Sequence, residues 1–446
     1  MTTTFPRSSP SALGIDARGV DALVDALERT PGVEPHGLVL LRHGQVAAQG
    51  WWAPYGPDRV HLLYSLSKSF TAAAVGIAVR EGLVDLDATA LSYFPEFDAD
   101  VTDDRSRRIR VRHLLAMASG HREETLDRAR AADATNTVRG FLLTPPDEEP
   151  GSVFAYNQPC TYTLAAIVRR VSGGSLVEYL RPRLLDPLGI DDLAWRRDDT
   201  GAELGFSGCY APTSAIAALG QLYLQRGVWD GERILDEDWV AAATSTQVEN
   251  PGEENPDWSQ GYGFQFWMAR HGFRGDGAYG QFCVVLPEQD VVLAMTGQSL
   301  DMQAVLDAVW QLLLPAVGGT TDTVADAALA ARLAALGLPA VVGGPLTGTA
   351  DLGPLAHDDA GWRLTLDVDG GTLSVPVGDG EWAVEGALAA SGAVAADGRT
   401  VLVDVRFVET PHLLHVRVDR STGDTATAWK TVPLHDGPLT LRRPAD

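Results

Sequence analysis

The chain has 446 residues, of which 45% are hydrophobic and 21% charged, and its formal net charge is −24. This balance is typical of a globular protein, and the length exceeds that of one ordinary hydrophobic core, so we expect two domains. The acidity and the lack of a basic segment argue against a nucleic-acid partner. No stretch has the pattern of a secretory signal or the roughly 20 apolar residues of a membrane span, so the sequence predicts a cytoplasmic protein without a membrane partner.

The cysteines are few, widely spaced and odd in number: Cys160, Cys209 and Cys283. This pattern argues against a disulfide framework and against a four-ligand zinc site. We expect all three to be small buried hydrophobes, and we expect neither a metal nor a cofactor.

Lysine is almost absent, since Lys68 and Lys430 are the only two lysines among 35 basic residues. Because nearly every basic residue is arginine, a position that keeps lysine is a candidate for a function that arginine cannot perform. Arginine cannot lose its proton near neutral pH, whereas a buried lysine can. Lys68 is therefore a candidate for proton transfer.

Hydrophobic periodicity predicts helices and strands in a mixed order along the first 315 residues. The expected helices lie at 17–30, 65–82, 111–119, 160–172, 215–225 and 302–314. A hairpin is expected at 37–48, and strands at 262–268 and 281–294 flank a predicted turn at 274–280. The pattern indicates an α+β protein in which an antiparallel sheet carries flanking helices and a helical subdomain.

The pattern changes after residue 315. Residues 315–345 are rich in Gly, Ala, Thr and Pro and predict a linker with one short helix. Six short alternating stretches between 362 and 432 then predict a small C-terminal β-barrel.

The segment Ser65-Leu-Ser-Lys68 opens the long apolar helix. Positions i and i+3 share one face of a helix, so the Ser65 hydroxyl and the Lys68 amine can meet. The helix N-terminus and burial both disfavour a charged amine, which lets a neutral Lys68 take the serine proton. The alternative for this short pattern is a solvated lysine in the first turn.

Tyr156 stands between the turn Pro150-Gly151 and a predicted helix, where a side chain can point into a cleft. A phenol beside a lysine can act as a phenolate or relay a proton to a leaving group. The alternative is a buried structural tyrosine.

Together these residues resemble the class C β-lactamase and penicillin-binding-protein-like serine hydrolase family over about residues 15–315. The likeness is carried by Tyr64–Phe70, Val111–Gly120, Pro150–Tyr156 and Leu184–Ile190. It implies a β-lactamase/transpeptidase-like catalytic domain, which we place at 1–318. From composition and strand pattern we expect a linker at 319–345 and a C-terminal β-barrel domain at 346–446. It also implies that Ser65 forms an acyl-enzyme while Lys68 and Tyr156 share the proton transfers.

The segment Gly275-Asp276-Gly277, followed by Ala278, resembles the third motif of the family, a Lys-Thr-Gly or His-x-Gly strand that faces the serine. By that resemblance the backbone N–H groups of Ser65 and Ala278 form an oxyanion hole. The sequence departs from the family here, because Gly275 replaces a basic residue and Asp276 adds negative charge.

Two further positions bear on the substrate. Gln158 replaces the usual Asn that contacts the acyl amide, and Arg274 is the one basic residue placed to compensate for Asp276. Unless Arg274 does so, we expect a carboxylate-bearing substrate to bind poorly, which argues against a true β-lactamase.

Three interpretations follow. The first is an esterase, amidase or peptidase acting on a small-molecule or peptidyl acyl substrate. The second is a penicillin-binding-protein-type thioesterase, a peptide macrocyclase or acyl transferase whose C-terminal barrel is lipocalin-like. The third is a non-catalytic binding protein of the same fold. Three roles are open to the C-terminal domain: it caps the cleft, contacts a carrier protein or mediates homodimerisation.

Overall fold

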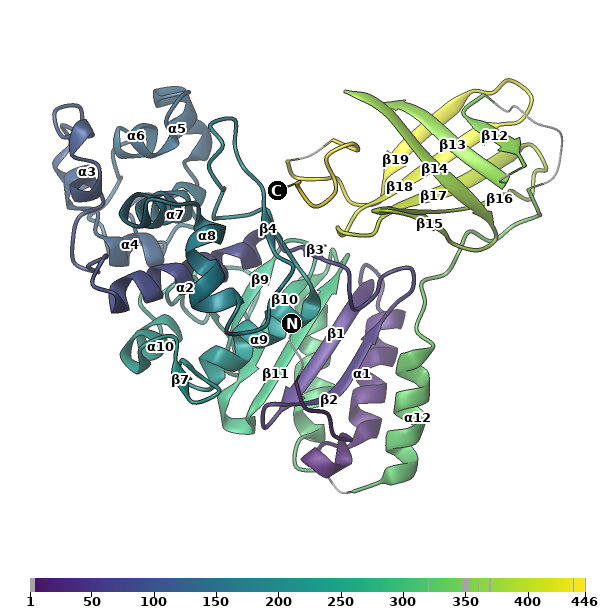
Figure 1. Ribbon diagram of the computed structural model, residues 1–446, viewed down its shortest axis with the longest axis horizontal. Helices are drawn as coiled ribbons and strands as arrows, with labels where there is room; N and C mark the ends of the chain where they lie inside the picture. Colours follow the sequence, from purple (N-terminus) through teal and green to yellow (C-terminus); the bar gives the residue numbers. More distant parts are fainter. Residues whose placement is uncertain are drawn as a thin grey trace.

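The computed structural model describes residues 5–319, 321–346, 353–359, 361–368, 370–435 and 437–445 (Figure 1). Its first part is built on a six-stranded sheet with the order β2-β1-β11-β10-β9-β8. Every pairing in this sheet is antiparallel. The strands are β1 (Pro35–Arg42), β2 (Gln45–Trp51), β8 (Trp267–Met268), β9 (Phe273–Gly277), β10 (Gln281–Leu286) and β11 (Val291–Gly297).

Helices cover both faces of this sheet. Alternate side chains of a strand point to opposite faces, so Leu38 and Leu40 of β1 join one core while Val39 and Leu41 join the other. The first core is closed by α1 (Ala17–Arg29), α11 (Met302–Ala308) and α12 (Thr323–Ala334). The second is closed by α2 (Ser67–Arg80) and α9 (Thr213–Leu224). A sheet buried on both faces gives the site a rigid base.

A helical subdomain packs beside the sheet (Figure 1). It contains α3 (Asp104–Arg108), α4 (Val111–Leu115), α5 (Leu126–Ala132), α6 (Thr137–Leu142), α7 (Gln158–Ser172) and α8 (Leu176–Leu180). Helix α10 (Glu237–Ala243) lies apart from these and contacts α9, where Trp239 Nε1 donates to the Tyr223 hydroxyl. Helix α2 lies between the sheet and this subdomain and contacts α7 and α8. It is buried all round from Ser67 to Ala78, as a helix with apolar residues on every side must be.

A second, curled sheet forms the C-terminal part (Figure 1). Its order is β12-β13-β14-β16-β17-β18-β19, with β15 paired to β16, and only β14 and β16 pair in parallel. The strands are β12 (Leu355–Asp358), β13 (Gly361–Val368), β14 (Gly371–Asp379), β15 (Ala383–Glu385), β16 (Leu388–Val394), β17 (Thr400–Phe407), β18 (Leu413–Asp419) and β19 (Thr425–Trp429). Within the described residues β12 and β19 do not pair, so the sheet is an open curl, and the predicted closed barrel is not confirmed.

Most predicted helices and the first hairpin are confirmed, and four expectations need correction. Residues 281–294, expected as strand throughout, divide into β10 and β11 around a 3-10 turn at Pro287–Gln289. Of residues 262–268, expected as one strand, only Trp267 and Met268 form β8. The predicted turn at 274–280 begins instead as strand β9. Ser65 lies in a short 3-10 helix, η2 (Tyr64–Leu66), that leads into α2. Strands β12 and β16 were not predicted at all.

Helix α12 lies inside the predicted linker and packs against the first core through Leu329 and Leu333. Arg332 ties it to α1 by ion pairs with Asp21, Asp25 and Glu28. In the part of the chain described here, no helix is long and apolar enough to cross a bilayer.

Candidate active site

Ser65 and Lys68 meet where η2 passes into α2. The Lys68 Nζ lies 3.0 Å from Ser65 Oγ and donates a second hydrogen bond of 2.9 Å to the Phe206 carbonyl oxygen. The Lys68 side chain is 1% exposed. The 3-10 turn thus keeps the contact that an α-helix would have given, and the solvated-lysine alternative is wrong.

Burial controls the charge of this amine. It lowers the pKa of Lys68 from 10.5 to about 7, although the carboxylates of Asp276 and Glu124 act in the opposite direction. Near neutral pH a substantial fraction of Lys68 is therefore uncharged. An uncharged amine at 3.0 Å from a hydroxyl is placed to accept its proton.

The ring of Tyr156 packs against the Lys68 amine. Its ring centroid lies 4.6 Å from Lys68 Nζ, and the ring stacks on Trp267 at a centroid distance of 5.2 Å. Burial, followed by the Asp276 carboxylate, raises the pKa of the Tyr156 phenol, and the adjacent Ser65 hydroxyl opposes this only in part. The phenol therefore holds its proton, which favours the relay role over the phenolate.

The next residue, Asn157, connects the segment that carries Tyr156 to Thr125, just before α7 begins. Its Oδ1 accepts hydrogen bonds of 2.9 Å from both the backbone N–H and the hydroxyl of Thr125. It is fully buried at the N-cap of α7. Sequence reasoning missed it, although an Asn before a helix is a recognisable start signal.

Strand β9 runs unusually close to the nucleophile. A Cβ on Gly277 would lie 2.0 Å from the Leu63 carbonyl oxygen, and one on Gly275 would lie 2.5 Å from Ser69 Oγ. Position 277 has no room for a side chain because it meets backbone, and a side chain at position 275 would have to displace Ser69 and Leu66. This approach brings Ala278, directly after β9, to the same cavity as Ser65.

Asp276 lies in the cavity wall and pairs with Arg274, which is buried behind it. Arg274 is 0% exposed, and its Nε donates to Asp276 Oδ2 at 3.0 Å. Its Nη1 donates to the carbonyl oxygens of Asp257 and Met268, and the guanidinium lies 4.2 Å above the Trp258 ring. Arg274 thus neutralises Asp276 from inside the protein and does not face a substrate.

A cavity of about 840 Å³ opens in front of these groups. Ser65, Tyr156, Asp276 and Ala278 line it, together with the indole rings of Trp258 and Trp267. The charged side chains in its described wall are all acidic: Asp276, Glu253 and Asp301. Gln158 is not part of this wall; its Oε1 is buried at the start of α7 without a hydrogen-bond partner.

Metal-binding clusters and disulfides are both absent from the described ranges. They contain no cluster of three His, Cys, Asp or Glu side chains able to hold a metal ion. The three cysteines are free and buried, as the sequence predicted.

Comparison with known proteins also indicates a hydrolase. A family model described as Beta-lactamase matches residues 20–315. A 6-aminohexanoate-dimer hydrolase of Paenarthrobacter ureafaciens is 27% identical over 69% of this chain and 89% of its own length. A lovastatin esterase of Penicillium rubens is 32% identical over 34% of this chain and 44% of its own length.

Solved structures agree in fold. The octameric penicillin-binding protein homologue from Pyrococcus abyssi has a TM-score of 0.51 and 16% identity, covering 90% of this chain and 98% of that chain. These findings define a serine hydrolase with a β-lactamase/transpeptidase-like domain. The chain belongs to the beta-lactamase family.

Proposed function

We propose that this protein hydrolyses ester or amide bonds through an acyl-enzyme on Ser65, with Lys68 as base and Tyr156 as proton relay. The single observation that carries the proposal is the 3.0 Å contact between Ser65 Oγ and a buried Lys68 amine. Relatives named as an esterase and as a dimer hydrolase support the same reaction class.

The reaction follows from the positions of these groups. Neutral Lys68 takes the Ser65 proton as Oγ bonds to the substrate carbonyl carbon, and the carbonyl π pair moves onto its oxygen. The N–H groups of Ser65 and Ala278 stabilise that oxyanion. When the bond to the leaving group breaks, the proton passes from the Lys68 ammonium through the Tyr156 phenol to the departing atom. Water then attacks the acyl-enzyme, loses a proton by the reverse route, and releases the acid and free Ser65.

The cavity also selects substrates by charge. Glu253, Asp276 and Asp301 line it, and Arg274 is not available to a ligand. Neutral and cationic acyl compounds are therefore favoured, since a carboxylate would meet like charge in a partly desolvated space. This supports an esterase or amidase rather than an enzyme acting on the carboxylate-bearing β-lactams.

Covalent labelling tests the proposal. A fluorophosphonate probe is expected to label the wild-type chain, with the adduct on the tryptic peptide containing Ser65, and to leave Ser65→Ala unlabelled. Lys68→Arg is expected to slow labelling at least 100-fold, because a guanidinium keeps the charge but cannot accept the proton. Ser92→Ala is the control, since Ser92 is an exposed serine whose Oγ bonds to the Thr89 carbonyl oxygen. Absence of labelling in the wild type would favour the non-catalytic binding protein.

A second candidate is the penicillin-binding-protein-type thioesterase, which passes the acyl group to an amine instead of water. The open cavity of about 840 Å³ favours it, because an acyl chain and an acceptor fit there together. This second candidate includes two features that we expect from the sequence: a lipocalin-like C-terminal sheet and a cytoplasmic location. Incubation with a peptidyl thioester separates the candidates: a macrocyclic product supports transfer, and free acid alone supports hydrolysis.

A further inference from the structure

The residues next to both oxyanion-hole donors have unusual backbones. Tyr64 precedes Ser65 and has φ 47°, and Tyr279 follows Ala278 and has φ 66°. Bulky residues avoid this left-handed region unless the surrounding structure holds them there. What holds these two tyrosines therefore also sets the direction of the neighbouring N–H groups.

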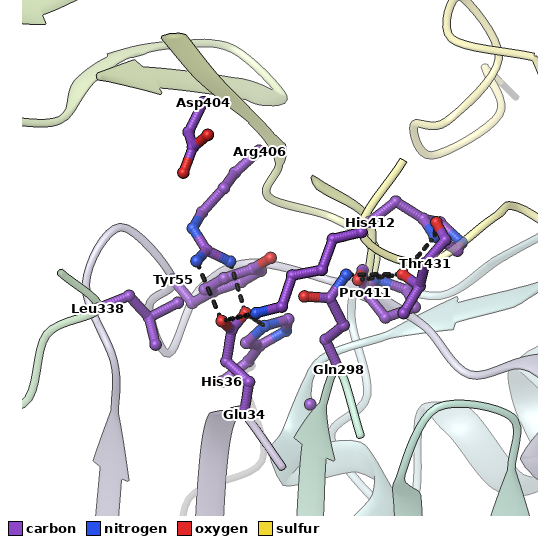
Figure 2. A network of polar contacts seen from close by, with 12 residues as sticks. Glu34, His36, Tyr55, Gln298, Leu338, Asp404, Arg406, Pro411, His412 and Thr431 are labelled. Carbon is purple, nitrogen blue, oxygen red and sulfur yellow. Dashed lines mark hydrogen bonds and ion pairs between the residues drawn. The ribbon is translucent and has the colours of Figure 1, made fainter. Parts of the chain in front are cut away.

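Tyr64 is held by the C-terminal part of the chain. Its hydroxyl lies 2.6 Å from Nε2 of His412, in the turn between β17 and β18. His412 Nδ1 lies 3.0 Å from the Thr431 carbonyl oxygen, which can only accept, so Nδ1 carries the proton and Nε2 accepts from Tyr64. His412 is fully buried, which fixes the ring in this orientation (Figure 2).

Tyr279 is held by the same region. Its hydroxyl donates to the Val432 carbonyl oxygen at 2.6 Å. The rings of Tyr64, Tyr279 and His412 pack edge to face, with centroid distances between 5.4 and 5.9 Å. The backbone N–H of Leu62 donates to the Glu409 carbonyl oxygen at 2.7 Å, which adds a backbone tie just before Tyr64. We call Glu409, His412, Thr431 and Val432 the clamp.

Further polar contacts anchor the clamp to the first part of the chain (Figure 2). Glu34 pairs with Arg406 at 2.6 Å and with Lys430 at 2.5 Å. Gln298 Nε2 donates to the Thr431 hydroxyl at 2.6 Å. Glu34 precedes β1 and Gln298 follows β11, so the contacts reach the central strands of the catalytic sheet.

We propose that the C-terminal sheet completes the active site by positioning its oxyanion hole. The clamp holds Tyr64 and Tyr279 in their left-handed conformations, and this aims the N–H groups of Ser65 and Ala278 at one point. His412 is a positioning residue that touches no substrate. The inference rests on the acyl-enzyme function proposed above and assigns a role to the C-terminal sheet within it.

Three Tyr→Phe variants of the full chain test the inference. Tyr64→Phe and Tyr279→Phe each remove one hydroxyl bonded to the clamp next to a donor. Tyr55→Phe is the matched control, because its hydroxyl bonds to the Thr410 carbonyl oxygen at 3.1 Å in the same turn but flanks no donor. The measurements are kcat and KM on a neutral chromogenic ester, inhibition by a phenylboronic acid, and the thermal midpoint of each variant.

Removing an oxyanion-hole donor outright lowers rates by about 10²–10³-fold, so misaligning one is expected to lower kcat about tenfold. KM should change less than about twofold, and boronate affinity should fall with kcat because the boronate mimics the tetrahedral state. Tyr55→Phe should keep kcat within about twofold even where its thermal midpoint falls equally. His412→Phe, which keeps a ring but loses the acceptor, should match Tyr64→Phe.

The inference is overturned if Tyr64→Phe and Tyr279→Phe behave like Tyr55→Phe, or if kcat falls while boronate affinity does not. If Tyr64→Phe does not fold, the half-buried Tyr279→Phe decides alone. A wild-type chain that is labelled at Ser65 but insensitive to these variants refutes only the clamp. A wild-type chain that is not labelled refutes the proposed function and the clamp with it.

Discussion

Replacing Lys68 with methionine should make the protein inactive and, in acid, more stable. Methionine has a similar length and no charge, so it suits a site that is 1% exposed. Lowering a lysine pKa from 10.5 to about 7 costs about 5 kcal/mol of folding free energy at pH 6, because each tenfold change in proton affinity is worth about 1.4 kcal/mol. The lost hydrogen bonds to Ser65 and the Phe206 carbonyl offset about 2 kcal/mol of this.

The stability gain should depend on pH. Between pH 7 and 10.5 the unfolded chain binds more protons at Lys68 than the folded chain, so wild-type stability rises with pH in that window. At pH 9 the remaining cost is about 2 kcal/mol, so the advantage of Lys68→Met falls from about 3 kcal/mol at pH 6 to near zero at pH 9.

Urea unfolding followed by tryptophan fluorescence at pH 6 and pH 9 measures this difference. The matched control is Lys430→Met, which removes the other lysine, a half-exposed partner of Glu34, and should not stabilise the chain at either pH. If Lys68→Met gains nothing at pH 6, or if its advantage is the same at both pH values, Lys68 is not a buried amine with a lowered pKa.

Two further results are expected. Because only neutral Lys68 accepts the Ser65 proton, kcat/KM on a neutral ester should rise with pH with a midpoint near 7, and a flat profile between pH 5.5 and 8.5 would contradict its role as base. Glu253→Gln should reduce the preference for a cationic over an anionic ester, measured as the ratio of their kcat/KM values, by about two- to fivefold, since Glu253 lines the cavity. The control Glu254→Gln changes an exposed neighbour and should leave this ratio unchanged. Equal effects of the two changes would exclude a direct contact between Glu253 and the substrate.

Local sequence signals were sufficient to predict the contact between Ser65 and Lys68, whereas the proposed catalytic role of the pair rested on the family resemblance. Ser65 and Lys68 are three residues apart, so any helical turn brings them together, whether it is a 3-10 helix or an α-helix. The turn and the helix start around Tyr156 predicted only that its side chain could reach a cleft, and its proton-transfer role came from the resemblance. These signals need no knowledge of distant contacts.

Strand β9 was missed for a physical reason. Gly275-Asp276-Gly277 has the composition of a turn, and neither Gly nor Asp favours a strand. The glycines are there because β9 passes within contact distance of Leu63 and Ser69, which lie about 200 positions earlier in the sequence. The clamp was missed for the same reason, since His412 and Tyr64 are separated by 348 residues.

Burial keeps Lys68 ready to lose its proton, although the charges around it act in the opposite direction. Asp276 lies close enough to raise the pKa of Lys68, and an unpaired carboxylate there would hold the amine charged. Arg274 pairs with Asp276 from the buried side, at 3.0 Å. Lys430, by contrast, sits directly on Glu34 and serves as an ordinary ion-pair partner. The scarcity of lysine therefore points to proton transfer only where the amine is also buried: Lys68 is 1% exposed, whereas the side chain of Lys430 is 37% exposed.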